Sequence, residues 1–240
     1  MRLDQRLVLM GLAETRSRAQ ALIAAGAVTV DGVVRHKPSD KSEGAIALTH
    51  DPVPWISRAA LKLVHALDEF ELKPAGIAAD IGASTGGFTE VLIARGACEV
   101  HAIDVGHGQI HPRIANLPGV HFHERINARN LPDGLLPDLD WIVSDVSFIS
   151  LTKALPRVLA LARPGAHLVA LIKPQFEAGP GRVGKQGIVS DPAVHAEVRA
   201  DIADFLRSLH WQILGETESP ITGSDGNREF LIAARRLEIR

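Results

Sequence analysis

The sequence has very little cysteine and no long apolar run. Cys98 is its only cysteine, so the chain cannot form an internal disulfide, and a single thiol cannot build a zinc site by itself. No apolar run approaches the roughly 18 residues that a membrane-spanning helix needs. Three of the first six residues are charged, and the start of the chain lacks the apolar region of a signal peptide. We therefore expect a soluble, cytoplasmic protein with no membrane partner.

An excess of basic charge is also missing. Lys and Arg number 26 against 28 Asp and Glu, a net charge of −2, which excludes a uniformly basic nucleic-acid-binding surface. Residues 1–50 hold seven Lys or Arg and five acids, so they carry +2 and the other 190 residues sum to −4. Contact with nucleic acid should therefore begin in the N-terminal region. With 240 residues, 46% of them hydrophobic, the chain can form one or two domains with real cores.

Residues 1–37 have the pattern of two short helices followed by a hairpin. Thr15 can cap the second helix, Gly26 suits its end, and Asp31-Gly32 separates two short strands. The basic residues here are Arg2, Arg6, Arg16, Arg18, Arg35 and Lys37. Their charge alone fits a solvated face of a small domain. The order of elements resembles the alpha-L RNA-binding module of small-subunit ribosomal proteins and pseudouridine synthases, which implies that these six residues bind RNA.

From residue 57 onward, β-like runs alternate with helical stretches. A helix is expected around residues 59–70. The strands are expected at 77–81, 99–104, 121–124, 141–145, 168–173, 212–215 and 230–234. Such alternation predicts an α/β fold, a Rossmann-like sheet with helices on both faces. Only a loop separates the last two runs, so they should form an antiparallel C-terminal hairpin, as in methyltransferases. We expect a small N-terminal α+β domain at 1–50, a linker at 51–56 and the α/β domain at 57–240.

The stretch Asp80–Thr89 follows a predicted strand and opens a helix, which is the place of a nucleotide-binding loop. Asp104 ends the next strand, where a carboxylate can accept both hydroxyls of a ribose. These features fit a dinucleotide or S-adenosylmethionine, and a purely structural turn remains an alternative. Three features favour S-adenosylmethionine. Ser84 replaces the middle glycine of the dinucleotide fingerprint and would crowd a pyrophosphate. The negative charge of Asp80 suits contact with the amino group of a methionine moiety, and no separate substrate domain follows. The candidate cofactor residues are Asp80, Gly82, Ser84, Thr85, Gly86, Gly87, Phe88, Asp104, Val105, Asn127 and Asp145.

Two charged residues lie at the carboxyl ends of predicted strands, where open α/β sheets place their chemistry. They are Asp145 and Lys173, and burial of the lysine would favour a neutral amine that can act as a base. Periodicity places Lys62 on the polar face of its helix, as an ordinary surface lysine. Glu229 opens the last strand and could equally be a solvated edge residue.

Together, Lys62, Asp145, Lys173 and Glu229 resemble the Lys-Asp-Lys-Glu tetrad of FtsJ-like ribose 2′-O-methyltransferases. The surrounding sequence is similar to the TlyA-type haemolysin/rRNA methyltransferase family over nearly the whole chain. The matching stretches are 55–63, 80–89, 102–109, 144–150, 173–179, 182–185 and 226–229. Trp55 and His107 stand where tyrosines are expected in the family. The resemblance implies an RNA-binding module joined to a methyltransferase that uses S-adenosylmethionine.

The resemblance also implies roles for the four residues. Lys173 would activate a ribose 2′-hydroxyl, Asp145 and Glu229 would orient the two lysines, and Lys62 would hold the ribose or a phosphate. Arg182 and Lys185, in a glycine-rich loop, would contact RNA or else belong to a plain flexible loop. The expected partner is ribosomal RNA or a ribosomal subunit, with cytidine as the expected target. No DNA partner is expected, and a monomer is favoured.

The residues argue against other methylation chemistries. Amino-group methylation needs a different loop after Asp145, and Cys98 lies away from the position that cytosine C5 methylation requires. His107, His111, His121 and His123 lack carboxylate or thiolate partners at a matching spacing, so no metal site is expected. Two rival functions remain: a membrane-active haemolysin, and a non-catalytic ribosome-assembly factor with a vestigial cofactor pocket.

Overall fold

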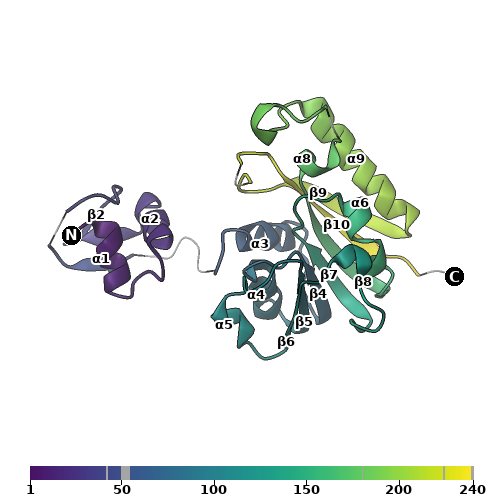
Figure 1. Cartoon of the computed structure of the whole chain (residues 1–240), viewed down its shortest axis with the longest axis horizontal. Helices are drawn as coiled ribbons and strands as arrows, with labels where there is room; N and C mark the ends of the chain where they lie inside the picture. The colour runs from purple at the N-terminus through teal and green to yellow at the C-terminus, as the bar shows by residue number, and fades with distance from the viewer. Residues whose placement is uncertain (42, 50–54, 180, 224, 239–240) are drawn as a thin grey trace. The chain divides into compact units, whose positions relative to one another are not determined.

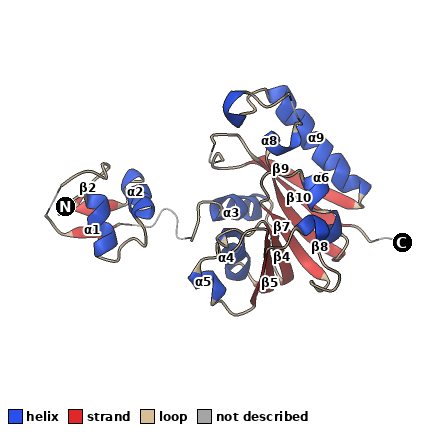
Figure 2. Cartoon of the chain, viewed as in Figure 1, coloured by secondary structure: helices blue, strands red, loops and turns tan. Residues whose placement is uncertain are grey.

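The computed structural model describes residues 1–41, 43–49, 55–179, 181–223 and 225–238. It divides into two compact units, Met1–Pro54 and Trp55–Arg240, which we call the N-terminal unit and the catalytic unit (Figures 1 and 2). The hydrophobic cores that the structure describes each lie within one unit. Most of the expected linker 51–56 lies outside the described residues, so its bounds and those of the two domains stay predictions.

The N-terminal unit packs two helices on a small antiparallel sheet. Its elements are α1 (Leu3–Leu9), α2 (Arg16–Ala24), β1 (Val28–Val30), β2 (Val33–Val34) and β3 (Ile46–Leu48), with strand order β2-β1-β3. Thr15 caps α2, because its side chain accepts a hydrogen bond from the backbone of Arg18 at 3.1 Å. Asp31 and Gly32 both have positive φ, 50° and 78°, as a tight hairpin turn of this kind requires. The predicted cap and hairpin are confirmed.

The catalytic unit contains a seven-stranded sheet with the order β6-β5-β4-β7-β8-β10-β9. The strands are β4 (Gly76–Ile81), β5 (Ala97–Asp104), β6 (Val120–Glu124), β7 (Leu139–Ser144), β8 (Ala162–Ile172), β9 (Trp211–Glu218) and β10 (Phe230–Arg236). The first five strands along the chain pair in parallel, and β10 pairs antiparallel with both β8 and β9. The predicted sheet and its antiparallel hairpin are confirmed.

Helices cover both faces of this sheet (Figure 1). Helices α3 (Ala60–Glu69) and α4 (Gly87–Ala94) bury one face, and α6 (Leu151–Ala154), α7 (Pro156–Leu159) and α9 (Pro192–Ser208) bury the other. Successive strand residues point to opposite faces, so Ala78 and Val143 join the first core while Ala79 and Ile142 join the second. The shorter helices are α5 (Pro112–Ala115), α8 (Pro174–Glu177) and the 3-10 turns Ala128–Asn130 and Lys185–Gly187.

The strand order reverses at the centre of the sheet. The chain leaves β4 toward β5 on one side, and it leaves the neighbouring strand β7 toward β8 on the other. Ligands of open α/β sheets bind in the crevice outside the strand ends at such a point. Here the backbone N–H of Asp145 donates to the Ile81 carbonyl at 3.0 Å, so the ends of β4 and β7 are joined.

Candidate active site and RNA-binding surface

The loop after β4 depends on two residues with positive φ. Gly82 has a φ of +85°, and a Cβ at this position would lie 2.8 Å from the carbonyl oxygen of Asp145, so only glycine fits between the ends of β4 and β7. Ser84 also has a positive φ, 49°, and its N–H donates to Oδ2 of Asp104 at 2.8 Å. The other Asp104 oxygen accepts from the N–H of Gly106 at 2.7 Å. The Asp104 carboxylate therefore links the loop after β4 to the loop after β5.

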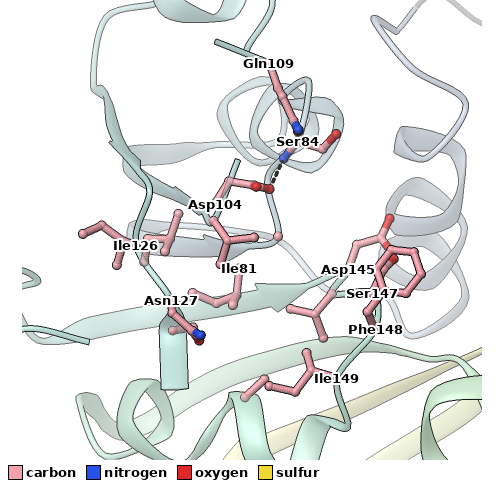
Figure 3. A pocket seen from close by; sticks show the side chains of 16 residues that line it. Ile81, Ser84, Asp104, Gln109, Ile126, Asn127, Asp145, Ser147, Phe148 and Ile149 are labelled. Carbon is pink, nitrogen blue, oxygen red and sulfur yellow. Dashed lines mark hydrogen bonds between the residues drawn. The ribbon is translucent and has the colours of Figure 1, made fainter. Parts of the chain in front are cut away.

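Two adjoining cavities lie beside this loop, and Gly82, Ser84, Asp145 and Ser147 line both. The first, of about 280 Å³, is the one in Figure 3. Its lining includes the predicted cofactor residues Gly82, Ser84, Asp104, Val105, Asn127 and Asp145. The second, of about 230 Å³, is lined by Thr85, Gly87 and Phe88 among the predicted residues, and also by Ser57 and Lys173. Asp80 and Gly86 line neither.

Asp80 is fully buried beneath the loop. Its Oδ2 accepts a hydrogen bond from the Thr89 hydroxyl at 2.7 Å, and its Oδ1 has no partner among the described residues. Burial raises the pKa of the Asp80 carboxyl to about 7; the bond from Thr89 opposes this shift, and the charges of Asp145 and Asp104 add to it. The predicted contact of Asp80 with the methionine amino group stays a prediction.

Lys173 directly follows β8, and its side-chain nitrogen is directed at the end of β7. Its Nζ lies 2.6 Å from Oδ1 of Asp145 and donates to the Ser147 hydroxyl at 2.7 Å. The lysine is 8% exposed, yet it lines the second cavity. A charged amine at the wall of a cavity, between a carboxylate and a hydroxyl, is placed to meet a polar group of a bound molecule.

A second buried ion pair joins Lys62 to Glu229. Nζ of Lys62 and Oε2 of Glu229 are 2.5 Å apart, and the residues are 7% and 3% exposed. The prediction of a surface lysine was wrong, because the face of α3 that periodicity marks as polar packs against the C-terminal hairpin. His65 on the same face, for example, contacts the Thr217 hydroxyl of β9 at 3.2 Å. The alternative that Glu229 is a solvated residue of an edge strand was wrong as well, since β10 lies inside the sheet between β8 and β9.

The sheet brings these two ion pairs together at one end of its strands. Strand register pairs Phe230 with Ile172, so Glu229 and Lys173 are the next residues along the two neighbouring strands. Asp145 directly follows β7, which pairs with β8 on its other side. The structure therefore gathers all four residues of the predicted tetrad at the carboxyl ends of the parallel strands.

Phe148 was not singled out from the sequence as a site residue. It is 90% exposed, has a φ of +66° and lines the first cavity beside Asp145 and Ser147 (Figure 3). Its ring lies 5.1 Å from that of Phe176. The sequence feature that could have identified Phe148 is an aromatic residue in the loop after a strand-ending acid, where polar residues are usual. Ser57 and Ser147 were missed too, because isolated serines carry no pattern.

In the N-terminal unit, one buried carboxylate organises two of the predicted RNA-binding arginines. Asp4 is 0% exposed and accepts bonds from Arg2 at 3.0 and 3.1 Å, from Arg16 at 2.8 Å and from Gln20 at 2.9 Å. The Arg2 guanidinium holds the pKa of Asp4 well below its usual range, with further help from Gln20 and Arg16. Sequence reasoning missed Asp4, because two of its partners, Arg16 and Gln20, lie on the other helix.

The other predicted RNA-binding residues are dispersed. Arg6 donates to the Gly44 carbonyl at 2.9 Å, and Arg18 lies on α2. Arg35 directly follows β2, and Lys37 lies two residues further along the chain. Arg182 is engaged by both carboxylate oxygens of Glu197 on α9, which was not foreseen. The side chain of Lys185 lies outside the described residues.

Among the described residues, no group of three or more His, Cys, Asp and Glu is arranged to hold a metal ion. Instead His101 Nδ1 contacts His123 Nε2 at 3.0 Å, and His107 pairs with Glu124 at 2.8 Å. Nor does the described part of the chain contain a helix long and apolar enough to cross a membrane.

The matches to protein families divide the chain much as its two structural units do. The FtsJ-like methyltransferase model matches residues 55–236, and the S4 domain model matches residues 1–42.

Individual proteins are similar over almost the whole chain. The 16S/23S rRNA (cytidine-2′-O)-methyltransferase TlyA of Mycobacterium tuberculosis is 44% identical over 239 residues, 98% of this chain and 89% of that protein. Hemolysin A of Brachyspira hyodysenteriae is 38% identical over 238 residues, covering 96% and 98%. A solved structure from Streptococcus thermophilus that carries a haemolysin name superposes with a TM-score of 0.76 at 36% identity, covering 99% of this chain and 89% of that one. On the match over residues 55–236 and these identities, the chain belongs to the FtsJ-like methyltransferase family and carries an S4 domain at its N-terminal end.

Proposed function

We propose that this chain transfers a methyl group from S-adenosylmethionine to the ribose 2′-hydroxyl of a cytidine in ribosomal RNA. The observation that carries the proposal is Lys173, held between Asp145 and Ser147 on the wall of a cavity that adjoins the Gly82 loop. The name of the relative from Mycobacterium tuberculosis supports cytidine and ribosomal RNA. Such a substrate would be met in the cytoplasm.

The residues around the first cavity fit S-adenosylmethionine. Gly82 leaves room for close backbone approach, and Asp104 stands at the end of β5, where its carboxylate can accept ribose hydroxyls. Apolar side chains such as Ile103, Ile126 and Ile149 line the same cavity and can pack against an adenine ring. Bound there, the cofactor supplies a methyl group already activated by the sulfonium.

The chain's own residues have to position and activate the hydroxyl. A ribose 2′-hydroxyl is a poor nucleophile at neutral pH, so a group that accepts its proton or hydrogen-bonds to it lowers the barrier. Lys173 faces the cavity and can serve in this way, with Asp145 and Ser147 fixing the direction of its Nζ. The Lys62–Glu229 pair lies beside it and can hold the ribose or a neighbouring phosphate.

RNA recognition is assigned to both units. The N-terminal unit presents Arg2 and Arg16, each partly exposed and held by Asp4, to phosphates of folded RNA. In the catalytic unit, the exposed ring of Phe148 beside the cavity can stack on the target base once it has left its helix.

The decisive experiment is nucleoside mass spectrometry on ribosomal RNA. Ribosomal subunits from cells lacking this protein are incubated with the purified chain and labelled S-adenosylmethionine, with Asp145→Asn as the inactive control. We expect label in 2′-O-methylcytidine with the wild type alone. Label on a base, or no label with either subunit, would refute the proposal. Binding of S-adenosylmethionine without any transfer would favour an assembly factor.

A second function is raised by the haemolysin names of two similar proteins. It is tested by dye release from liposomes with the wild type and with Asp145→Asn. Release by both proteins at equal rates would establish a membrane activity independent of the methyltransferase site.

A further inference from the structure

The single helical turn after Lys173 contacts the segment that carries Phe148. This turn, α8, ends at Glu177, whose Oε1 accepts a hydrogen bond from the backbone N–H of Leu151 at 2.8 Å. Leu151 is the first residue of α6, so the carboxylate caps that helix from 26 residues away. Phe176 of the same turn contacts Phe148, with the ring centroids 5.1 Å apart.

Residues 146–150, which we call the Phe148 loop, are thus fixed at two points. Near one end, Ser147 accepts a bond from Lys173, and just beyond the other, Leu151 donates to Glu177. Between these points Phe148 has a φ of +66°, a backbone conformation that costs free energy for a side chain of this size. Such strain persists only where the surrounding structure holds it in place. The two anchors supply that restraint.

Glu177 itself lies away from the reacting groups. It lines neither cavity, and burial raises the pKa of its carboxyl, an effect opposed by the bonds from Ser150 and Leu151 and by the charge of Lys153. Removing this carboxylate from water costs free energy. Its hydrogen bond from the first residue of α6 offsets part of that cost.

We propose that Glu177 is a positioning residue that holds the Phe148 loop in the conformation in which Phe148 borders the cavity. The inference rests on the proposed function, because its effect is seen through methylation of RNA. It predicts that Glu177 affects the RNA substrate through Phe148, with little effect on the tetrad.

The test compares kcat/KM for ribosomal subunits between the wild type and three variants. Glu177→Ala removes the acceptor for Leu151 and should lower kcat/KM about tenfold, whereas Glu177→Gln keeps an oxygen at that place and should stay within about twofold of wild type. Asp140→Ala is the matched control. Its carboxylate also accepts a backbone N–H, that of Ile77 at 2.9 Å, but at the opposite end of the parallel strands, so activity should persist. Should Glu177→Ala not fold, Glu177→Asp replaces it, because its shorter side chain withdraws the carboxylate from Leu151.

A double-mutant cycle with Phe148→Ala separates positioning from general destabilisation. If Glu177 acts through Phe148, adding Glu177→Ala to Phe148→Ala causes no further loss. Losses that multiply would overturn the proposal, as would a Glu177→Gln variant as impaired as Glu177→Ala. If Phe148→Ala alone has full activity, both the stacking role and this inference fail while the methyltransferase assignment stands. Absence of methylation by the wild type would refute the proposed function itself.

Discussion

Nζ of Lys173 is held between Asp145 and Ser147 and can act in two ways: as a neutral amine it can accept the proton of the 2′-hydroxyl, whereas as an ammonium it can only balance charge. Lys173→Arg separates these roles, since an arginine keeps the charge but does not deprotonate in proteins. If the lysine accepts the proton, single-turnover methylation should fall at least about 100-fold, with cofactor and RNA affinities within a few-fold of wild type.

Retention of most of the single-turnover rate by Lys173→Arg would exclude proton acceptance and leave positioning as its contribution. Lys173→Met is the companion variant. It removes the charge as well, so it should be inactive under either interpretation.

Asp80 predicts how the stability of the catalytic unit depends on pH. Its pKa is raised to about 7 in the folded protein, so between about pH 4 and 7 the folded state keeps a proton that the unfolded state has released. Stability should therefore fall as pH rises through this window, by roughly 1 kcal/mol for each pH unit, and level off above it. Asp80→Asn still accepts the Thr89 hydrogen bond but cannot ionise.

Urea unfolding at pH 5 and pH 8 measures this effect. The three tryptophans, Trp55, Trp141 and Trp211, all belong to the catalytic unit, so their fluorescence reports its unfolding selectively. Asp80→Asn should gain stability relative to wild type on going from pH 5 to pH 8. An unchanged difference would mean that Asp80 is already ionised at pH 5.

Site residues were predictable where chemistry marks the end of a strand. Asp145 and Lys173 follow this rule, and the structure places both beside the crevice. Lys62 and Glu229 were found by resemblance alone, since their residues suggested solvent exposure and the contact between them spans 167 positions. Phe148, Asp4 and Glu177 were missed because their neighbours come from other elements, which periodicity along one segment cannot reveal.

The elements themselves were easier to predict than the contacts between them. Each expected strand of the catalytic unit is present, and the largest difference is β8, which begins at Ala162 where the sequence suggested residue 168. Pro164 and Gly165 interrupt the strand pattern there and lie at a register shift, on the far side of which Ala162 still pairs with Leu139 of β7.

The junction between β4 and β7 gives a prediction about the cofactor loop. In Gly82→Ala the new Cβ would lie 2.8 Å from the Asp145 carbonyl at a φ of +85°, so the strand ends must separate. S-adenosylmethionine affinity measured by calorimetry should fall about tenfold or more. Gly108→Ala is the matched control, because it also has a positive φ, 64°, but nothing lies within 4 Å of its added Cβ. Equal losses in both variants would mean that strain alone, without the contact to Asp145, controls binding.

The division of the molecule into two units predicts that RNA binding and cofactor binding depend on different parts of the chain. The core of the N-terminal unit, built around Leu3, Leu22 and Val30, includes no residue of the catalytic unit, so a chain starting at Trp55 should fold. Removing residues 1–54 takes away the guanidiniums that Asp4 holds, while the Gly82 loop and Asp104 remain.

Affinity for ribosomal subunits should therefore fall at least about tenfold, and its dependence on salt should become shallower, because each lost phosphate contact removes close to one counterion from the slope. S-adenosylmethionine affinity should stay within about twofold of the full chain. The salt titration is the deciding measurement, since a loss of affinity with an unchanged slope would show that the N-terminal unit contributes shape but no phosphate contacts. Parallel loss of cofactor binding would show that the catalytic unit depends on the N-terminal unit to form its site.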